Sequence, residues 1–192
     1  MPPLNPARRR ALTDAAIQLL ATSGAHGLTH RAAERSAGLP PGTASNYYRS
    51  REALLVATAE RVAELHLAEM EQAVTEGDLR LVELLSHSLL EAATTNRDRY
   101  VAVFELQLEA TRRPALARIL ASILDATVQL TARHHTRAGL AVPPDRVPTL
   151  ITLYAGALYS LVTMLPEQVE ADMVHGLARA IVTGALADGE AP

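Results

Sequence analysis

The chain has 192 residues, of which 48% are hydrophobic and 20% charged, and this balance excludes an intrinsically disordered or collagen-like protein. It contains no cysteine, which excludes disulfide frameworks and thiolate zinc sites. The net charge is −3, but residues 1–55 carry +4 and the remainder −7. A basic amino-terminal segment on an acidic body is typical of a protein that meets a polyanion at one end.

Proline positions and apolar periodicity predict an all-α protein of about nine helices. No stretch shows the sustained period-2 alternation of a strand, and no Asn-Gly or Asp-Gly pair joins two such stretches as a hairpin turn would. The helices are expected at residues 6–22, 30–37, 41–48, 50–74, 79–95, 98–112, 115–138, 147–165 and 167–187.

The first helices have recognisable start and stop signals. Thr29 is suited to cap the second helix, because its hydroxyl can accept an orphan backbone N–H. Gly38 can take the left-handed conformation that ends this helix, and Pro41 suits the first position of the third. Ser50 is the expected cap of the fourth. Two short helices joined by a glycine turn and supported by a preceding helix make a helix-turn-helix.

The third helix has the surface of a recognition helix. Gly42 lets the backbone approach DNA, and Asn46 can pair with adenine in the major groove. Tyr47 can donate its hydroxyl to a phosphate, Arg51 can clamp the DNA backbone, and Tyr48 is expected to pack inward. The predicted DNA-binding residues are Thr29, His30, Arg31, Pro41, Gly42, Thr43, Ser45, Asn46, Tyr47 and Arg51.

These residues resemble the DNA-binding domain of the tetracycline-repressor (TetR) family over about residues 7–55. The similarity is carried by the segments 27–33, 37–39, 42–43, 47–48 and 50–54. Ser45 departs from the pattern, because the family commonly has Tyr there. Pro40 stands where Ser often caps the third helix, so this cap is missing. The resemblance implies that Arg8–Arg10 form an arm along phosphates or in a minor groove; a solubilising tail is the alternative.

The resemblance further implies that residues 1–52 bind DNA and that the larger helical domain at residues 53–192 binds a small effector and forms a homodimer. Residues 104–114 look like a segment of actinobacterial-type TetR C-terminal domains. Helical spacing places several residues near this segment on one face, which suits a mostly apolar pocket with polar handles; a core helix is the alternative. The predicted pocket residues are Tyr100, Phe104, Gln107, Leu108, Thr111 and Tyr154.

The last two helices have the composition of a dimer interface. Residues 147–166 carry no charge, and small residues there permit close approach of a neighbouring helix. This stretch is long enough to span a bilayer, but its Thr, Ser and Tyr residues favour a helix buried on several sides. A monomeric core is the alternative. The predicted interface residues are Leu153, Gly156, Ala157, Ser160, Leu161, Met173, Leu177, Ile181 and Gly184.

No catalytic signature, metal-ligand spacing or targeting segment is recognisable, so we expect a cytoplasmic protein that is not an enzyme and uses no cofactor or metal. The sequence predicts a ligand-responsive repressor that binds double-stranded DNA as a homodimer on an inverted repeat, without a membrane partner. The alternative from another class is a helical interaction module or a small helical enzyme that uses the C-terminal pocket.

Overall fold

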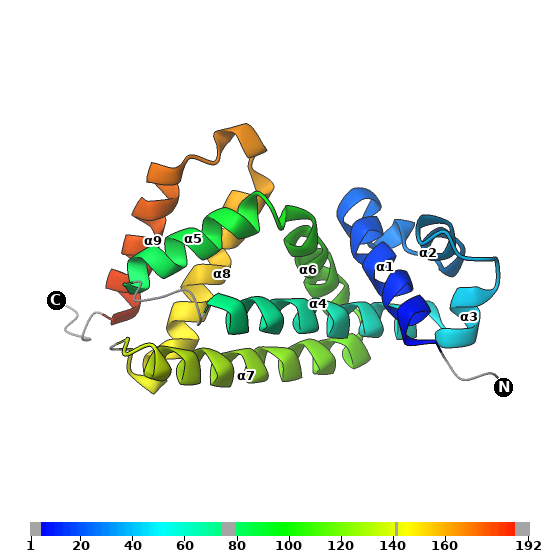
Figure 1. Cartoon of the computed structure of the whole chain (residues 1–192), viewed down its shortest axis with the longest axis horizontal. Helices are drawn as coiled ribbons and strands as arrows, with labels where there is room; N and C mark the ends of the chain where they lie inside the picture. Colours follow the sequence, from blue (N-terminus) through cyan, green and yellow to red (C-terminus); the bar gives the residue numbers. More distant parts are fainter. Residues whose placement is uncertain (1–4, 74–79, 141, 187–192) are drawn as a thin grey trace. The chain divides into compact units, whose positions relative to one another are not determined.

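The computed structural model describes residues 5–73, 80–140 and 142–186 (Figure 1). Regular structure in this part is helical throughout, with nine α-helices and two short 3-10 helices, which confirms the predicted fold class. The chain divides into two compact units. We call Met1–Glu69 with Asp98–Ile123 the head unit, and Met70–Arg97 with Leu124–Pro192 the body unit.

The head unit is built on three amino-terminal helices and on parts of three longer ones. They are α1 (Pro6–Gly27), α2 (His30–Ser36), α3 (Thr43–Tyr47), most of α4 (Arg51–Ala73), α6 (Arg97–Ala110) and the first part of α7 (Pro114–Arg137). The core is rich in leucine, and Tyr48 is 4% exposed, which confirms that it packs inward. The fully buried leucines of this core are Leu12, Leu20, Leu28, Leu54, Leu55, Leu106 and Leu116.

The body unit contains α5 (Leu81–Ala93), α8 (Val147–Thr163), α9 (Ala171–Leu186) and the rest of α7. Each of α5, α8 and α9 packs against the other two. The Ser88 hydroxyl lies 2.7 Å from that of Tyr154, and the Ser86 hydroxyl lies 3.3 Å from Nδ1 of His175. Two 3-10 helices, Pro144–Arg146 and Pro166–Gln168, flank α8.

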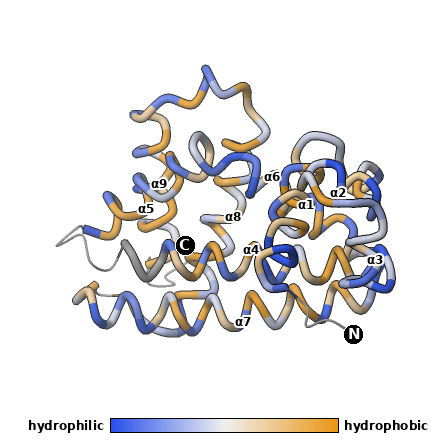
Figure 2. Tube along the Cα trace, turned by 45° about the vertical axis from the view of Figure 1, so that its right-hand side comes forward, coloured by the Kyte–Doolittle hydropathy of each residue, from blue (hydrophilic) through white to orange (hydrophobic). Residues whose placement is uncertain are grey.

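Hydrophilic and hydrophobic residues are interspersed along α4 and α7, as expected of helices that bury one side (Figure 2). The charge-free stretch at residues 147–166 is not one helix, because α8 ends at Thr163 and Pro166 begins a separate turn. Within the described residues, α7 alone is long and apolar enough to cross a membrane by length and composition. Its Leu116 is fully buried and its Ile119 packs against the head core, but only 11% of its apolar window is buried.

Candidate nucleic-acid interface

The helix-turn-helix begins with two local signals that the structure confirms. The Thr29 hydroxyl accepts the backbone N–H of Ala32 at 3.1 Å and caps α2. Gly38 ends α2 with φ of +64°, and the Leu39 N–H then donates to the Glu34 carbonyl at 2.9 Å. This six-to-one hydrogen bond is that of a Schellman ending, and it directs the chain into the turn.

The third helix begins at Thr43, two residues later than predicted from Pro41. The Thr43 N–H donates to the Pro40 carbonyl at 3.2 Å, and Gly42 has φ of +84° and ψ of −8°. A proline followed by glycine in this conformation forms a type II turn, so Pro41 and Gly42 belong to the turn. The Thr43 hydroxyl also donates to Pro40, at 2.6 Å, and Thr43 is 8% exposed. This interaction directs Thr43 into the protein, contrary to its predicted contact with DNA.

The exposed face of α3 consists of a few small polar residues. Ser45 and Asn46 are exposed, as is Gly42 in the preceding turn, whereas Ala44 is fully buried. Arg31 on α2 is also exposed. Helix α2 thus exposes a cation and the neighbouring α3 exposes short hydrogen-bonding side chains, the groups that phosphate and base-edge contacts use.

Glu34 is a residue of this site that the sequence interpretation missed. It is 5% exposed, and its Oε1 accepts the Ala44 N–H at 2.7 Å. The sequence did carry a signal for this role. Glu34 is one of the few acidic residues in the basic segment at residues 1–55, and the third helix of that segment lacks its usual Ser cap. The buried carboxylate of α2 therefore takes the place of that cap.

The hydroxyl of Tyr47 is engaged within the protein. It accepts the Asn5 N–H at 3.0 Å and donates to the Asn5 carbonyl at 3.2 Å. The Asn5 side chain in turn caps α1 by accepting the Ala7 N–H at 2.9 Å. Because a tyrosine hydroxyl has one proton to donate, the predicted donation to a phosphate competes with this bond. Tyr47 thus ties the end of α3 to the start of α1, where Arg8–Arg10 are exposed.

Arg51 also faces the protein rather than solvent. Its Nε donates to the Leu28 carbonyl at 2.9 Å, and its Nη2 donates to the Ala25 carbonyl. These bonds satisfy carbonyls at the end of α1. In this structure Arg51 braces the turn between α1 and α2. Its role as a clamp on the DNA backbone stays a prediction.

The two remaining predicted residues of α2 and the turn differ in exposure. His30 is half-buried, and its Nε2 is buried without a hydrogen-bond partner among the described residues. Pro41 is exposed at the turn. Pro41 has no side-chain donor for a base, and the Nε2 of His30 is enclosed.

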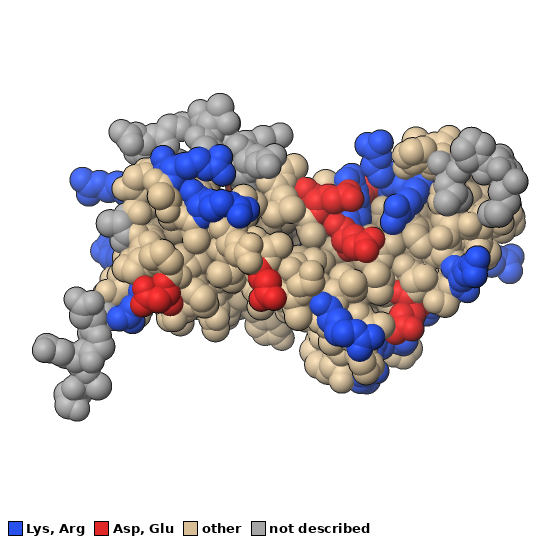
Figure 3. Space-filling model, turned by 90° about the horizontal axis from the view of Figure 1, so that it is seen from below, with Lys and Arg blue, Asp and Glu red and all other residues tan. Residues whose placement is uncertain are grey.

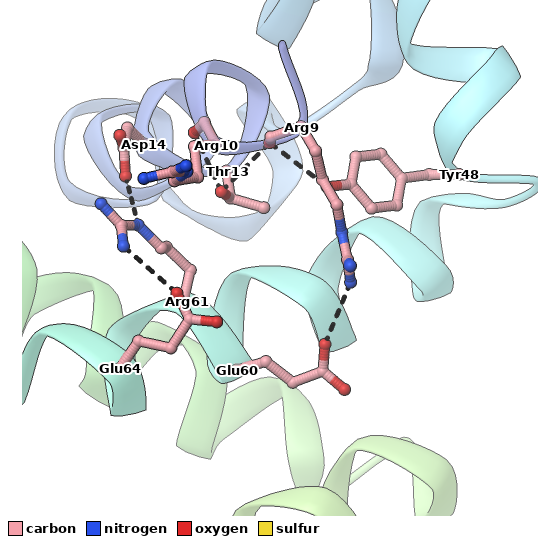
Figure 4. Close-up of polar contacts among 8 residues, drawn as sticks. All are labelled: Arg9, Arg10, Thr13, Asp14, Tyr48, Glu60, Arg61 and Glu64. Atoms are coloured by element: carbon pink, nitrogen blue, oxygen red, sulfur yellow. Dashed lines mark hydrogen bonds and ion pairs between the residues drawn. The ribbon is translucent and has the colours of Figure 1, made fainter. Parts of the chain in front are cut away.

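Helix α1 is held on α4 by a group of polar contacts (Figure 4). Arg61 of α4 lies 2.8 Å from the Asp14 carboxylate and 3.2 Å from that of Glu64, and the hydrogen bond to Asp14 raises the pKa of Arg61. Arg9 lies 3.6 Å from Glu60, and the Tyr48 hydroxyl donates to the Arg9 carbonyl at 3.4 Å. Burial raises the pKa of Tyr48. One arginine of the basic arm is thus paired within the head unit.

Helix α6 contacts the broken end of α1. Gly24 has φ of +63° and ψ of −178°, which interrupts the helix and leaves the next N–H without a helical acceptor. Glu105 of α6 accepts this N–H, from Ala25, at 2.8 Å. The last turn of α1 is therefore held by Glu105 from one side and by Arg51 from the other.

The predicted pocket residues on α6 differ in how far they are buried. Tyr100 is buried and Phe104 half-buried, but Gln107, Leu108 and Thr111 are exposed, with Leu108 at 57%. The helix is apolar on several sides, so periodicity did not identify the covered one: Ala102 and Leu106 are the apolar residues that it buries. Tyr154 belongs to the body unit.

A polar cluster of two buried and two half-buried residues lies between α4 and α6. The Tyr100 hydroxyl is 3.5 Å from Nδ1 of His66, and Arg99 donates to Glu69 at 2.5 Å while its guanidinium lies 5.0 Å from the Tyr100 ring centroid. Burial, assisted by the nearby Arg99, lowers the pKa of His66. These four residues, His66, Glu69, Arg99 and Tyr100, are called the α4–α6 cluster below.

A groove of about 460 Å³ lies elsewhere in the head unit. It is bordered by the beginning of α1, the end of α3, the beginning of α4 and one residue of α7. None of the predicted pocket residues lines it. Its lining residues include Arg9, Tyr47, Tyr48, Ser50, Val56 and Glu60.

The predicted dimer residues fall into three groups by exposure. Leu161 is fully buried and Ile181 is 5% exposed, so both belong to the core of the body unit and are unavailable to a partner. Leu153, at 40% exposure, is on the open face of α8. Gly156, Ser160 and Gly184 are exposed as well, and Ala157, Met173 and Leu177 are half-buried.

No group of three or more metal-ligating side chains occurs in the described part of the chain. The neighbouring His134 and His135 of α7 are 6% and 3% exposed. Burial lowers the pKa of both, and that of His135 falls to about 4. They are therefore neutral at physiological pH. Charged groups on the face seen in Figure 3 form small separate patches with uncharged surface between them.

Part of the chain is similar in sequence to a known regulator. HTH-type transcriptional regulator BetI of Rhizobium meliloti (strain 1021) is 40% identical over 55 residues, which are 29% of this chain and 27% of that protein. The match thus spans about a quarter of the curated relative's length.

Among solved structures, a transcriptional regulator from Rhodococcus sp. Rha1 has a TM-score of 0.76 at 15% identity, covering 93% of this chain and 95% of that chain. The multidrug binding protein EbrR complexed with ethidium has a TM-score of 0.68 at 24% identity, covering 93% and 99%. A TetR-family member from Streptomyces coelicolor A3 has a TM-score of 0.69 at 24% identity, covering 91% and 97%. These similarities establish the fold.

Two family models match the chain itself. The model described as "Bacterial regulatory proteins, tetR family" matches residues 12–58, and that described as "Tetracyclin repressor-like, C-terminal domain" matches residues 76–188. Since the second match covers more than half of the chain and the first covers the helix-turn-helix, the protein belongs to the TetR family of bacterial transcriptional regulators.

Proposed function

We propose that this protein is a cytoplasmic repressor that binds an inverted-repeat operator as a homodimer and releases it when a small molecule binds. The observation that carries the proposal is the braced α3, which exposes Ser45 and Asn46, while the neighbouring α2 exposes the basic Arg31. DNA binding is assigned to residues 1–52, and effector binding and dimerisation to residues 53–192. Regulation, rather than catalysis, is the activity we assign to the chain.

The operator follows from the symmetry of a dimer. Two identical heads that enter successive major grooves require half-sites whose centres lie about 34–36 Å apart. Selection of bound duplexes from random DNA, with purified full-length protein, tests this. We expect an enriched inverted repeat whose affinity falls steeply with salt, because Arg–phosphate contacts release counterions. Recovery of no enriched sequence would contradict the proposal.

The dimer is assigned to the open face of α8 and the adjoining part of α9. This face combines Leu153 with the small residues Gly156 and Ser160, and Tyr159 is 52% exposed there. Leu153→Arg is expected to shift the protein toward monomer in sedimentation or light-scattering measurements and to weaken operator binding. Leu124→Arg is the matched control, because Leu124 is similarly exposed, at 52%, on α7. Equal dimerisation by both variants would contradict this assignment.

The effector is assigned to the α4–α6 cluster, where the buried Arg99 and Tyr100 lie with the half-buried His66 and Glu69. EbrR, the relative whose crystals hold ethidium, motivates a small-molecule screen. Compounds that raise the melting temperature are then tested for release of the selected operator. A regulator requires such a ligand to have different affinities for the DNA-bound and free arrangements. A stabilising compound that leaves operator affinity unchanged would not be its effector.

A further inference from the structure

The recognition helix is too short to hold its own position. Helix α3 has five residues, Thr43–Tyr47, and isolated helices of this length do not form in water. Contacts from other helices must therefore fix its start and its direction. The hydrogen bonds of Tyr47 to Asn5 hold the carboxyl-terminal end of α3.

The amino-terminal end is held by Glu34. Gly42 occupies the cap position and has no side chain to accept a hydrogen bond. The Thr43 N–H is satisfied by the Pro40 carbonyl, and the next free donor is the N–H of Ala44. This donor is buried, and the Glu34 carboxylate accepts it at 2.7 Å. A carboxylate at this end of a helix also interacts favourably with its dipole.

Glu34 accepts hydrogen bonds from both sides of the turn between α2 and α3. Its backbone carbonyl accepts the Leu39 N–H at 2.9 Å, just after α2, while its carboxylate accepts the Ala44 N–H in the first turn of α3. Since Glu34 is 5% exposed, water does not replace it readily at either point. A charge-assisted hydrogen bond in such surroundings is short and directional.

We propose that Glu34 is a positioning residue for DNA recognition, which acts from α2 as the missing cap of α3 and sets how Ser45 and Asn46 meet the base edges. This inference rests on the proposed function of operator binding. Loss of the carboxylate leaves the Ala44 N–H buried without an acceptor, so the first turn of α3 loosens. Base contacts then weaken more than the phosphate contacts of the arginines, which lie on other segments.

The test compares Glu34→Ala, which removes the acceptor, with Glu34→Gln, which removes the charge and keeps an amide oxygen at the same reach. Both variants are measured against the selected operator and against a random duplex of equal length. We expect Glu34→Ala to lose at least tenfold in operator affinity and less than twofold on random DNA. Glu34→Gln is expected within threefold of the wild type on both. Glu91→Ala, on the exposed face of α5, controls for loss of a glutamate elsewhere.

Wild-type affinity of Glu34→Ala for the operator would overturn the inference, and so would equal losses by the Ala and Gln variants. A wild-type protein that binds no DNA specifically would instead overturn the proposed function. Should Glu34→Ala fail to fold, amide exchange decides. In the wild type and in Glu34→Gln, we expect the Ala44 N–H to exchange at least tenfold more slowly than in an unfolded chain. Unprotected exchange of that N–H in the wild type would overturn the inference.

Discussion

Substitution of Gly24 by alanine is expected to destabilise the end of α1. The backbone of Gly24 has φ of +63° and ψ of −178°, a region that is essentially restricted to glycine. Placing a residue with a Cβ there costs about 1–3 kcal/mol. This part of the cost arises within the residue itself and does not depend on its neighbours.

A second part of the cost comes from α6. A Cβ at position 24 would lie 3.3 Å from Oε2 of Glu105, the atom that accepts the Ala25 N–H at 2.8 Å. Displacing this carboxylate weakens a hydrogen bond to a charged group, and Glu105 is half-buried, so we assign about 1 kcal/mol to it. The expected total for Gly24→Ala is about 2–4 kcal/mol.

Denaturant unfolding followed by far-ultraviolet circular dichroism measures this loss. Gly176→Ala is the matched control, because Gly176 lies exposed within α9 and a Cβ there meets no atom within 4 Å. Alanine is the better helix former by about 1 kcal/mol, so the control is expected to be stabilised. A Gly24→Ala variant within about 0.5 kcal/mol of wild type would refute the reasoning, since this is the size of ordinary surface changes.

Three further predictions concern the head unit and the buried histidines. Arg51→Ala is expected to lower the free energy of unfolding by about 3 kcal/mol, because two charge-assisted hydrogen bonds are lost. The midpoint of denaturant unfolding measures this loss. An unchanged midpoint, together with a salt dependence of DNA binding that is reduced by about one phosphate contact, would instead place Arg51 on DNA. Burial holds the pKa of His135 at about 4, against an ordinary value of 6.5. The free energy of unfolding is therefore expected to fall by on the order of 3 kcal/mol as the pH is lowered from 6.5 to 4, because the unfolded chain takes up the proton first. His135→Leu should flatten that pH profile in thermal melts, and an equally steep profile would contradict the assignment. Arg31→Ala and Tyr47→Phe are expected to weaken operator binding in gel-shift titrations while effector affinity is unchanged, and equal operator affinity would refute their roles.

The parts of the fold that depend on neighbouring residues could be predicted from the sequence. The cap at Thr29 and the left-handed Gly38 involve partners within a few positions, so residue type and spacing identified them. Ser50 likewise accepts the Ala53 N–H at 3.1 Å, as expected of a cap.

The contacts that join different helices could not be predicted in the same way. The acceptor for Ala44 lies ten residues earlier, on Glu34, and the partners of Arg51 lie more than twenty residues away. A side chain's type reveals what it can bind but not which element it will face. On α6 the ambiguity is of another kind, because apolar residues surround the helix and Leu108 proved to be on its open side.

The Glu105–Ala25 contact limits how far the DNA-binding segment can be treated as a transferable module. A fragment that stops at residue 52 lacks the carboxylate that satisfies the broken end of α1, and it also lacks Arg61, which holds Asp14. A chimera that joins this segment to the carboxyl-terminal part of a relative needs an acceptor at the position of Glu105. Transplantation should therefore carry α6 along with the first three helices, although the chain places it some fifty residues later.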